Sequence, residues 1–256
     1  MCRRIEKELG LIGGLNEGDR VIQLSDGIVV KYGHGVTPTE AATQAFAYRH
    51  VDRSLVRVPR VYRFFQDRCD VSWPKGYLFM EYVPSRNLKD LYLSIHKEII
   101  PRVASIIYTL VKFPVVRCQA QWAVVSSEDT DGTTCSCISD TNSWLNKRLT
   151  VRNESTDLTP YLLVLCHVDL CRRNMILDLE DDSMPIGLVD WGHAELFPLF
   201  FEITTISCLN PYEVQYQDFL LQAAEMLLHL TEDEKRLMKL MQIVRAASLR
   251  HLLSGC

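Results

Sequence analysis

Short apolar runs in the middle of the chain each border a polar residue, and this pattern most constrains how the chain can fold. The runs are YLLVLCHVDL (161–170), NMILDLE (174–180) and PIGLVDW (185–191). Runs of this length, separated by polar turns, are typical of β-strands. If the later runs pair as a hairpin, we expect Asp169, Asn174 and Asp190 to meet at the same edge of a small sheet.

The spacing of these polar residues matches the needs of phosphoryl transfer. His167, Asp169 and Asn174 form the pattern His-x-Asp-x4-Asn, and Asp190-Trp191-Gly192 follows. The reaction needs an acceptor for the hydroxyl proton, oxygen ligands for Mg²⁺ and a cation for the nucleotide phosphates. Asp169 is therefore the expected catalytic base, and Asn174 and Asp190 are the expected Mg²⁺ ligands.

A plainer interpretation of the same residues stays open. Asp169 and Asn174 could be ordinary turn residues, and Asp190 could cap the end of a strand. His167 is expected to hold the loop by hydrogen bonds and not to act as the base.

A lysine in an apolar strand gives independent support. Asp26-Gly27 predicts a tight turn between VIQL (21–24) and IVVKYG (28–33), which contains Lys31. The head of a lysine in a packed strand needs a partner or ligand, so Lys31 is expected to contact nucleotide phosphates. The alternative is an edge-strand lysine that faces solvent.

Glu40 is the expected partner of Lys31. Thr37 and Pro38 predict the start of a helix over about 38–50, which places Glu40 in its first turn. Thr37-x-x-Glu40 also has the spacing of a capping box, which is the alternative role for this glutamate.

The remaining patterns predict an α+β protein with two lobes. Strands are expected over 60–67 and 76–83. They are followed by two helical pieces over 87–113, interrupted by Pro101, and by an irregular loop over 114–142. Helices are expected over 143–151 and about 212–253, where Thr231 and Glu234 form a capping box. Residues 1–83 are the expected nucleotide-binding lobe, a small antiparallel sheet with one helix. Residues 84–256 are the expected larger, mostly helical lobe.

The segment between these lobes is FMEYV (79–83). In a two-lobed kinase such a link holds the adenine through backbone hydrogen bonds, so Glu81 and Val83 are expected to bind the nucleotide. An ordinary exit from a strand is the alternative.

Composition excludes several other classes of protein. The chain of 256 residues is 47% hydrophobic with a net charge of −4, and no basic stripe indicates nucleic-acid binding. We expect reduced thiols, because the nine cysteines are scattered, and a cytoplasmic location, because no segment resembles a signal peptide or a membrane span. The protein is also expected to be a monomer. Cys135 and Cys137 lack a second pair at zinc-site spacing, so they are interpreted as loop cysteines.

LCHVDLCRRNMIL (165–177) and IGLVDWGHAELFPLFFEI (186–203) resemble the aminoglycoside phosphotransferase family, especially its fungal branch. The resemblance covers about 20–113 and 143–230. It implies a protein-kinase-like fold with ATP between two lobes, Asp169 as base, Asn174 and Asp190 as Mg²⁺ ligands, and Lys31 paired with Glu40. Two departures are the lack of a recognisable glycine-rich loop and the unfamiliar segment 114–142.

The expected function is a Mg-ATP-dependent kinase that acts on a hydroxyl of a small metabolite. A cationic acceptor would need acidic groups, and Glu128, Asp129, Asp131, Glu195 and Glu213 are available, although each is more simply solvated surface. The alternative is a non-catalytic nucleotide-binding or scaffold protein. A protein kinase ranks last, because no Ala-Pro-Glu block follows Asp190-Trp191-Gly192.

Overall fold

The computed structural model describes residues 10–14, 18–69, 73–93, 96, 98–112, 138–178, 181, 183–207 and 213–254. The chain divides into two compact units, Met1–Tyr92 with Arg172–Ala194 and Leu93–Cys171 with Glu195–Cys256. The unit that contains Lys31 therefore also contains Asn174 and Asp190. The expected lobes, 1–83 and 84–256, stay a prediction.

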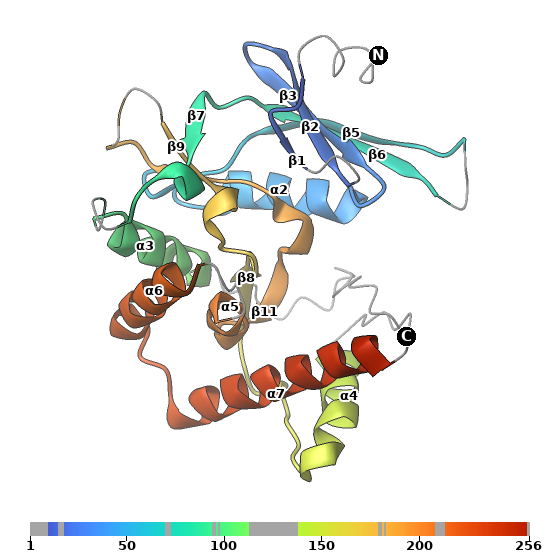
Figure 1. Cartoon of the computed structure of the whole chain (residues 1–256), viewed down its shortest axis with the longest axis vertical. Coiled ribbons are helices and arrows are strands. Elements are labelled where there is room, and N and C mark those ends of the chain that lie inside the picture. The colour runs from blue at the N-terminus through green and yellow to red at the C-terminus, as the bar shows by residue number, and fades with distance from the viewer. Residues whose placement is uncertain are drawn as a thin grey trace. The chain divides into compact units, whose positions relative to one another are not determined.

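A five-stranded antiparallel sheet forms much of the first unit (Figure 1). Its order is β1-β2-β3-β6-β5, with bounds Gly13–Gly14, Arg20–Ser25, Ile28–Gly33, Lys75–Glu81 and Val61–Asp67. Helix α2 (Pro38–His50) packs against β5. Val29, Ala41 and Leu78 belong to one of the apolar clusters of this unit. The expected hairpin around Asp26-Gly27 and the expected helix over 38–50 are confirmed.

A second, four-stranded sheet belongs to the same unit. Its order is β4-β10-β9-β7, with bounds Val56–Arg57, Ile186–Leu188, Met175–Asp178 and Ser85–Asn87. Short helical turns flank it at Leu88–Asp90 (η1), Arg172–Asn174 (η3) and Trp191–His193 (η4). Strands β9 and β10 form the predicted hairpin, and the Val189 N–H donates to the Asn174 carbonyl at 3.0 Å. Asn174 and Asp190 therefore lie at the same end of this hairpin.

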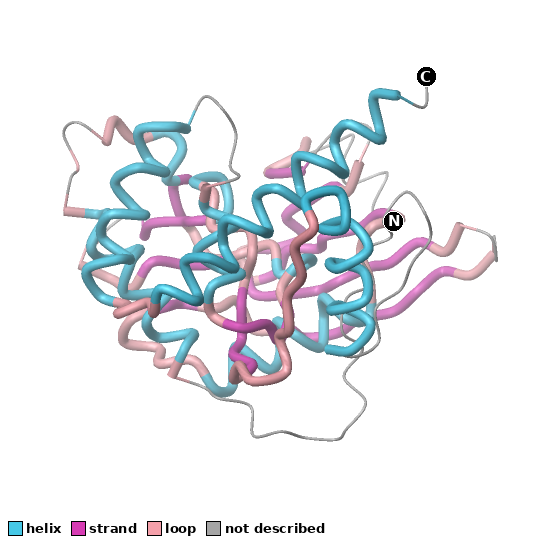
Figure 2. The backbone as a smooth tube through the Cα atoms, turned by 90° about the horizontal axis from the view of Figure 1, so that it is seen from below, coloured by secondary structure: helices cyan, strands magenta, loops and turns pink. Residues whose placement is uncertain are grey.

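The second unit is mostly helical (Figure 2). Its elements are α3 (Ile99–Val111), α4 (Ile138–Leu149), η2 (Thr150–Arg152), β8 (Leu163–Cys166), β11 (Glu195–Pro198), α5 (Phe200–Ile206), α6 (Val214–Leu227) and α7 (Glu232–Ser254). Strands β8 and β11 pair as an antiparallel ribbon. Within the described residues, no helix is both long enough and apolar enough to cross a bilayer.

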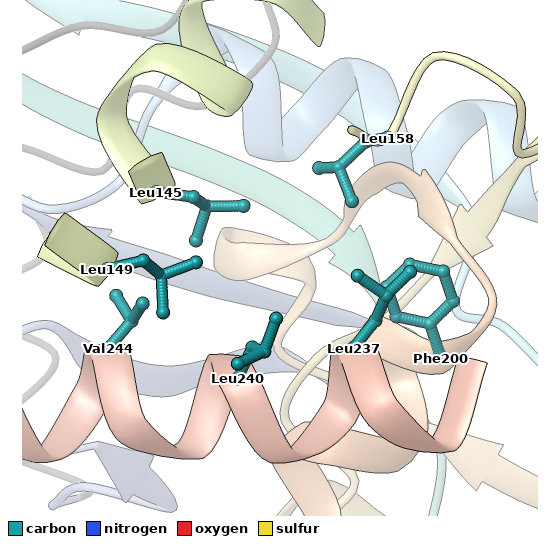
Figure 3. Packing of buried hydrophobic residues seen from close by; sticks show 7 residues of the cluster. All are labelled: Leu145, Leu149, Leu158, Phe200, Leu237, Leu240 and Val244. Atoms are coloured by element: carbon teal, nitrogen blue, oxygen red, sulfur yellow. The ribbon is translucent and has the colours of Figure 1, made fainter. Parts of the chain in front are cut away.

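One face of α7 builds the core of the second unit. Leu237, Leu240 and Val244 recur at helical spacing and lie in one cluster with Leu145 and Leu149 of α4 (Figure 3). Each of these side chains is at most 5% exposed. The capping box that starts α7 is confirmed, since the Thr231 hydroxyl accepts from the Glu234 N–H at 3.2 Å and the Glu234 carboxylate accepts from the Thr231 N–H at 2.8 Å.

Two expectations for the helices are wrong. Pro101 does not divide a helix, because it lies in the first turn of α3, where a backbone N–H has no intrahelical partner to lose. Helix α4 begins at Ile138, inside the stretch expected to be irregular. The Asn142 side chain accepts from the Leu158 N–H at 2.9 Å, so it is used for tertiary contact and does not compete with the helix. Residues 113–137, with Cys135, Cys137 and the acidic residues Glu128, Asp129 and Asp131, lie outside the described residues.

Candidate active site

Lys31 is buried in β3 and bridges two carboxylates. Its Nζ lies 2.6 Å from Glu40 Oε1 and 2.7 Å from Asp190 Oδ1. Burial alone would lower the pKa of Lys31, but the two carboxylates outweigh this effect and raise the pKa, so the side chain stays charged. The lysine is 9% exposed, which excludes the alternative of an edge-strand lysine facing solvent. We call Lys31, Glu40 and Asp190 the charge cluster.

Glu40 combines parts of both roles considered for it. The Thr37 hydroxyl accepts from the Glu40 N–H at 3.1 Å, so Thr37 caps α2 as expected. The Glu40 carboxylate, however, pairs with Lys31. The residue is 1% exposed, and among the described residues its Oε2 has no hydrogen-bond partner. Burial raises the pKa of Glu40, and the ammonium of Lys31 opposes this rise.

Asp190 leaves the sheet in a conformation that few residues adopt. Its φ of 65° and ψ of 68° lie in the left-handed region, which aspartate tolerates better than most non-glycine residues. Such conformations persist where the surrounding structure enforces them, and they cluster at functional sites. The Asp190 side chain is 40% exposed, so its Oδ1 binds Lys31 while solvent still reaches the carboxylate.

The donor set beside the charge cluster fits a magnesium ion that is bound together with a nucleotide. Asn174, which is 3% exposed, and Asp190 supply amide and carboxylate oxygens from adjacent ends of β9 and β10. Mg²⁺ usually takes one or two protein carboxylates and completes its shell with water and substrate phosphates. Among the described residues, no group of three or more His, Cys, Asp or Glu side chains could hold a metal by itself.

Glu81 and Val83 are not part of the charge cluster. The Glu81 carboxylate accepts from Arg57 at 2.8 Å and from the Arg60 N–H at 3.1 Å, and the Glu81 N–H donates to the Arg60 carbonyl at 2.9 Å. The Val83 carbonyl accepts from the Ser85 hydroxyl at 2.9 Å. Both residues thus hold the segment that leaves β6, and their contact with an adenine stays a prediction.

Asp169 belongs to the second unit, in the loop after β8. Its side chain is half-buried. His167 is fully buried, and its backbone N–H donates to the Glu202 carboxylate at 2.5 Å. The structure thus brings Lys31, Glu40, Asp190 and Asn174 together in one unit, while Asp169 is held within the other.

Sequence reasoning missed two residues that hold the Asp169 loop. Glu202 of α5 is 1% exposed, and burial raises its pKa to about 7 although backbone N–H groups of Val168 and His167 donate to it. Tyr216 of α6 donates its hydroxyl to the Leu170 carbonyl at 2.9 Å. A single acid within the apolar run LFPLFFEI was a usable signal, because a buried charge needs partners. Nothing in the sequence around Tyr216 pointed to its role.

Comparison with known proteins agrees with this architecture. The solved aminoglycoside-3'-phosphotransferase of type VIII has a TM-score of 0.58 at 17% identity, over 91% of this chain and 90% of that one. A thermostable mutant of aminoglycoside phosphotransferase APH(4)-Ia, in ternary complex with AMP-PNP and hygromycin B, has a TM-score of 0.57 at 13% identity, over 96% and 87%. The microcompartment-associated aminopropanol kinase has a TM-score of 0.55 at 15% identity, over 93% and 81%.

At these identities the structural likeness shows a shared fold, and it confirms the expected α+β kinase-like fold class. A search of curated proteins finds no match. A family model described as the phosphotransferase enzyme family matches residues 15–238. Because this match spans most of the described chain, the protein belongs to the phosphotransferase enzyme family.

Proposed function

We propose that the protein is a Mg-ATP-dependent kinase that transfers the γ-phosphoryl group to a hydroxyl of a small molecule. The observation that carries the proposal is the charge cluster, in which a buried lysine bridges a helix glutamate and the aspartate at the end of β10. Phosphoryl transfer depends mainly on positioning and on stabilising charge at the phosphates. Lys31, which two carboxylates keep charged, supplies a positive charge that can stabilise the phosphates. The carboxylate of Asp190 is partly exposed, so solvent reaches this side of the charge cluster.

Each group has a defined task in this proposal. Lys31 binds nucleotide phosphate, and Glu40 holds its ammonium in place. Asn174 and Asp190 hold Mg²⁺, which neutralises charge on the β- and γ-phosphate oxygens when it is bound. Asp169 accepts the proton of the acceptor hydroxyl and orients that oxygen.

The nucleotide and the lobes complete the proposal. We infer ATP because AMP-PNP, an ATP analogue, is bound in one of the similar structures. Residues 1–83 form the nucleotide-binding lobe with Glu81 and Val83 at the adenine, and residues 84–256 form the catalytic and substrate-binding lobe. The protein acts as a cytoplasmic monomer on a small hydroxylated metabolite. The similar structures act on acceptors as different as aminoglycosides and aminopropanol, so the fold does not choose the acceptor.

The test is phosphoryl transfer from Mg-ATP to a panel of sugars, amino alcohols and aminoglycosides. Replacement of the base in Asp169→Asn should lower kcat by about 10²–10⁴-fold. Asp181→Asn, at an exposed turn where the described contacts of the side chain are with Ser183, is the matched control and should keep full activity.

Two outcomes would contradict the proposal. If wild type transfers no phosphate to any acceptor while Mg-ATP raises its Tm, the protein is a non-catalytic nucleotide-binding protein. If Asp169→Asn keeps wild-type kcat on an accepted substrate, Asp169 is not the base.

A further inference from the structure

A pocket lies between α2 and the start of β5, outside the charge cluster. Its volume is about 390 Å³, and it is lined by Ala45, Tyr48, Arg49, Arg60 and Val61. The first three residues belong to α2, and the other two lead into β5. Ala45 is five residues beyond Glu40, which is about 7 Å along the axis of a helix. The pocket is therefore separate from the lysine that the proposed function assigns to the nucleotide.

A buried hydrogen bond holds the two walls of this pocket together. The Gln44 side chain is 1% exposed, and its Nε2 donates to the Pro59 carbonyl at 2.8 Å. Gln44 precedes the lining residues of α2, and Pro59 directly precedes Arg60. The pocket thus exists in the resting protein, as is usual for sites that bind small molecules, and its volume lies in their range.

The two arginines of the pocket are exposed and form no ion pair with any described residue. The Arg49 Nε donates to the carbonyl of Ala45, one turn earlier in the same helix, at 3.0 Å. The guanidinium of Arg60 lies over the ring of Tyr62, 5.7 Å from its centroid. Both guanidinium groups therefore keep their charge and most of their donors available to a ligand.

The surrounding segment is strongly basic in an otherwise acidic chain. Residues 49–63 contain five arginines and a single acid, Asp52, whereas the whole chain has a net charge of −4. The Asp52 carboxylate accepts from the Ser54 N–H at 2.9 Å and from its hydroxyl at 2.7 Å. The carboxylate of Glu81 accepts from the Arg57 side chain and from the Arg60 N–H. This local excess of positive charge should attract anions to the pocket.

The lining residues favour a phosphate group over other anions. A guanidinium presents a planar fork of donors that matches phosphate oxygens, and two of them carry a charge of +2. A phosphate monoester carries about −1.5 to −2 at pH 7, whereas a monocarboxylate would leave one arginine without a counter-charge. Tyr48, Ala45 and Val61 offer apolar surface to the carbon part of such a molecule.

We propose that this pocket is a second anion site, which binds the phosphate group of a small phosphorylated molecule with Arg49 and Arg60, one from each wall, and packs its carbon part against Tyr48. The inference goes beyond the proposed function and does not depend on it. One wall is α2, which also carries Glu40, so a bound ligand should hold this helix more firmly against β5.

Thermal unfolding with glycerol phosphate, and with inorganic phosphate as the smaller probe, tests the proposal. Chloride at the same ionic strength controls for screening, and glycerol controls for the carbon part. If the Kd is about 1 mM, about 10 mM glycerol phosphate should raise the Tm by about 3–5 °C. Inorganic phosphate should give a smaller rise, and both controls should give none. A wild-type Tm that does not respond to either phosphate would overturn the proposal.

Arginine variants show whether this pocket is the place of binding. Arg49→Gln and Arg60→Gln should each weaken binding by about tenfold or more, and the double variant should lose the Tm shift. Both side chains are exposed, so the Tm without ligand should hardly change. Arg152→Gln makes the same chemical change at an exposed position of η2 and should keep the full shift. If the double variant also keeps the full shift, the phosphate binds elsewhere, for example at Lys31, and the proposal fails.

Hydrogen exchange locates the ligand without any measurement of activity. Glycerol phosphate should slow exchange of the amides near the end of α2 by about threefold or more, including the Val51 N–H that donates to the Ala47 carbonyl at 2.9 Å. The double variant should show no such slowing. If wild type shows it but transfers no phosphoryl group from Mg-ATP, the proposed function fails and the second anion site stands. If exchange over α2 is unchanged at a saturating concentration, the second anion site fails whatever the activity.

Discussion

Removal of the Lys31 ammonium should destabilise the protein strongly. In Lys31→Met the side chain keeps its length and apolar stem, but Glu40 loses its partner at 2.6 Å. Glu40 is 1% exposed, and no described residue hydrogen-bonds its Oε2. The substitution therefore leaves a buried carboxylate with no described partner for either oxygen. Breaking a buried pair in this way costs about 3–5 kcal/mol. The loss of the Asp190 contact adds little, because Asp190 is 40% exposed and water replaces the lysine.

The loss should depend on pH with a definite sign. Burial already raises the pKa of Glu40 above its ordinary value of 4.5, and without Lys31 the pKa rises further. The folded variant then binds a proton that the unfolded chain does not, so its stability increases as pH falls. One pH unit is worth at most about 1.4 kcal/mol per proton. Between about pH 7.5 and 5.5 the deficit of Lys31→Met should shrink by up to about 3 kcal/mol.

Urea denaturation followed by circular dichroism at both pH values measures this deficit. Two variants serve as controls. Lys31→Met with Glu40→Gln places a neutral amide where the carboxylate was, and it should remove most of the pH dependence. Lys235→Met breaks a pair of similar length, 2.7 Å to Glu232, but both side chains are exposed, so stability should hardly change. The reasoning is refuted if Lys31→Met unfolds at the wild-type urea concentration, or if its deficit is the same at both pH values.

Three further predictions concern the second unit. Burial raises the pKa of Glu202 to about 7 in the folded protein, against an ordinary 4.5, so its contribution to stability is fully present below about pH 4.5 and is lost as pH rises through 7. The unfolding free energy of wild type minus that of Glu202→Gln, measured by urea titration, should therefore fall by up to about 3 kcal/mol over this range. A difference that does not change with pH would contradict the shift. Leu240→Ala should lower the unfolding free energy by about 2–5 kcal/mol, because Leu240 is 5% exposed in the core between α7 and α4. Met226, at 76% exposure, is the control, and Met226→Ala should change the unfolding free energy little. Equal losses in the two variants would be inconsistent with the packing. Thr231→Ala should cost about 1 kcal/mol through the lost cap of α7, and Thr231→Ser should recover most of it; an unchanged Tm in the alanine variant would disprove the capping role.

Local signals in the sequence were sufficient for much of the first unit. Asp26-Gly27 predicted the β2–β3 turn, and Thr37 with Pro38 predicted the start of α2, because turn and cap preferences depend on the residues themselves. The hairpin of β9 and β10 followed from two adjacent apolar runs, and with it the meeting of Asn174 and Asp190. Pro101 shows the limit of such signals. A proline breaks a helix interior but is tolerated in the first turn, and only the position of the helix start decides between the two.

The sequence by itself determined which chemistry was available: a lysine in an apolar strand, an acid in the following helix, and an aspartate and an asparagine at the ends of paired strands. It left open whether Lys31 faces solvent and whether Glu40 serves only the helix cap. Tertiary structure decided both. Lys31 is buried between Glu40 and Asp190, which is 159 residues away along the chain, and no local pattern encodes that burial. Only tertiary structure revealed which groups of the Asp169 loop Glu202 and Tyr216 bind. Glu202 and Tyr216 act through backbone groups of a distant loop, and backbone groups carry no signature in the sequence.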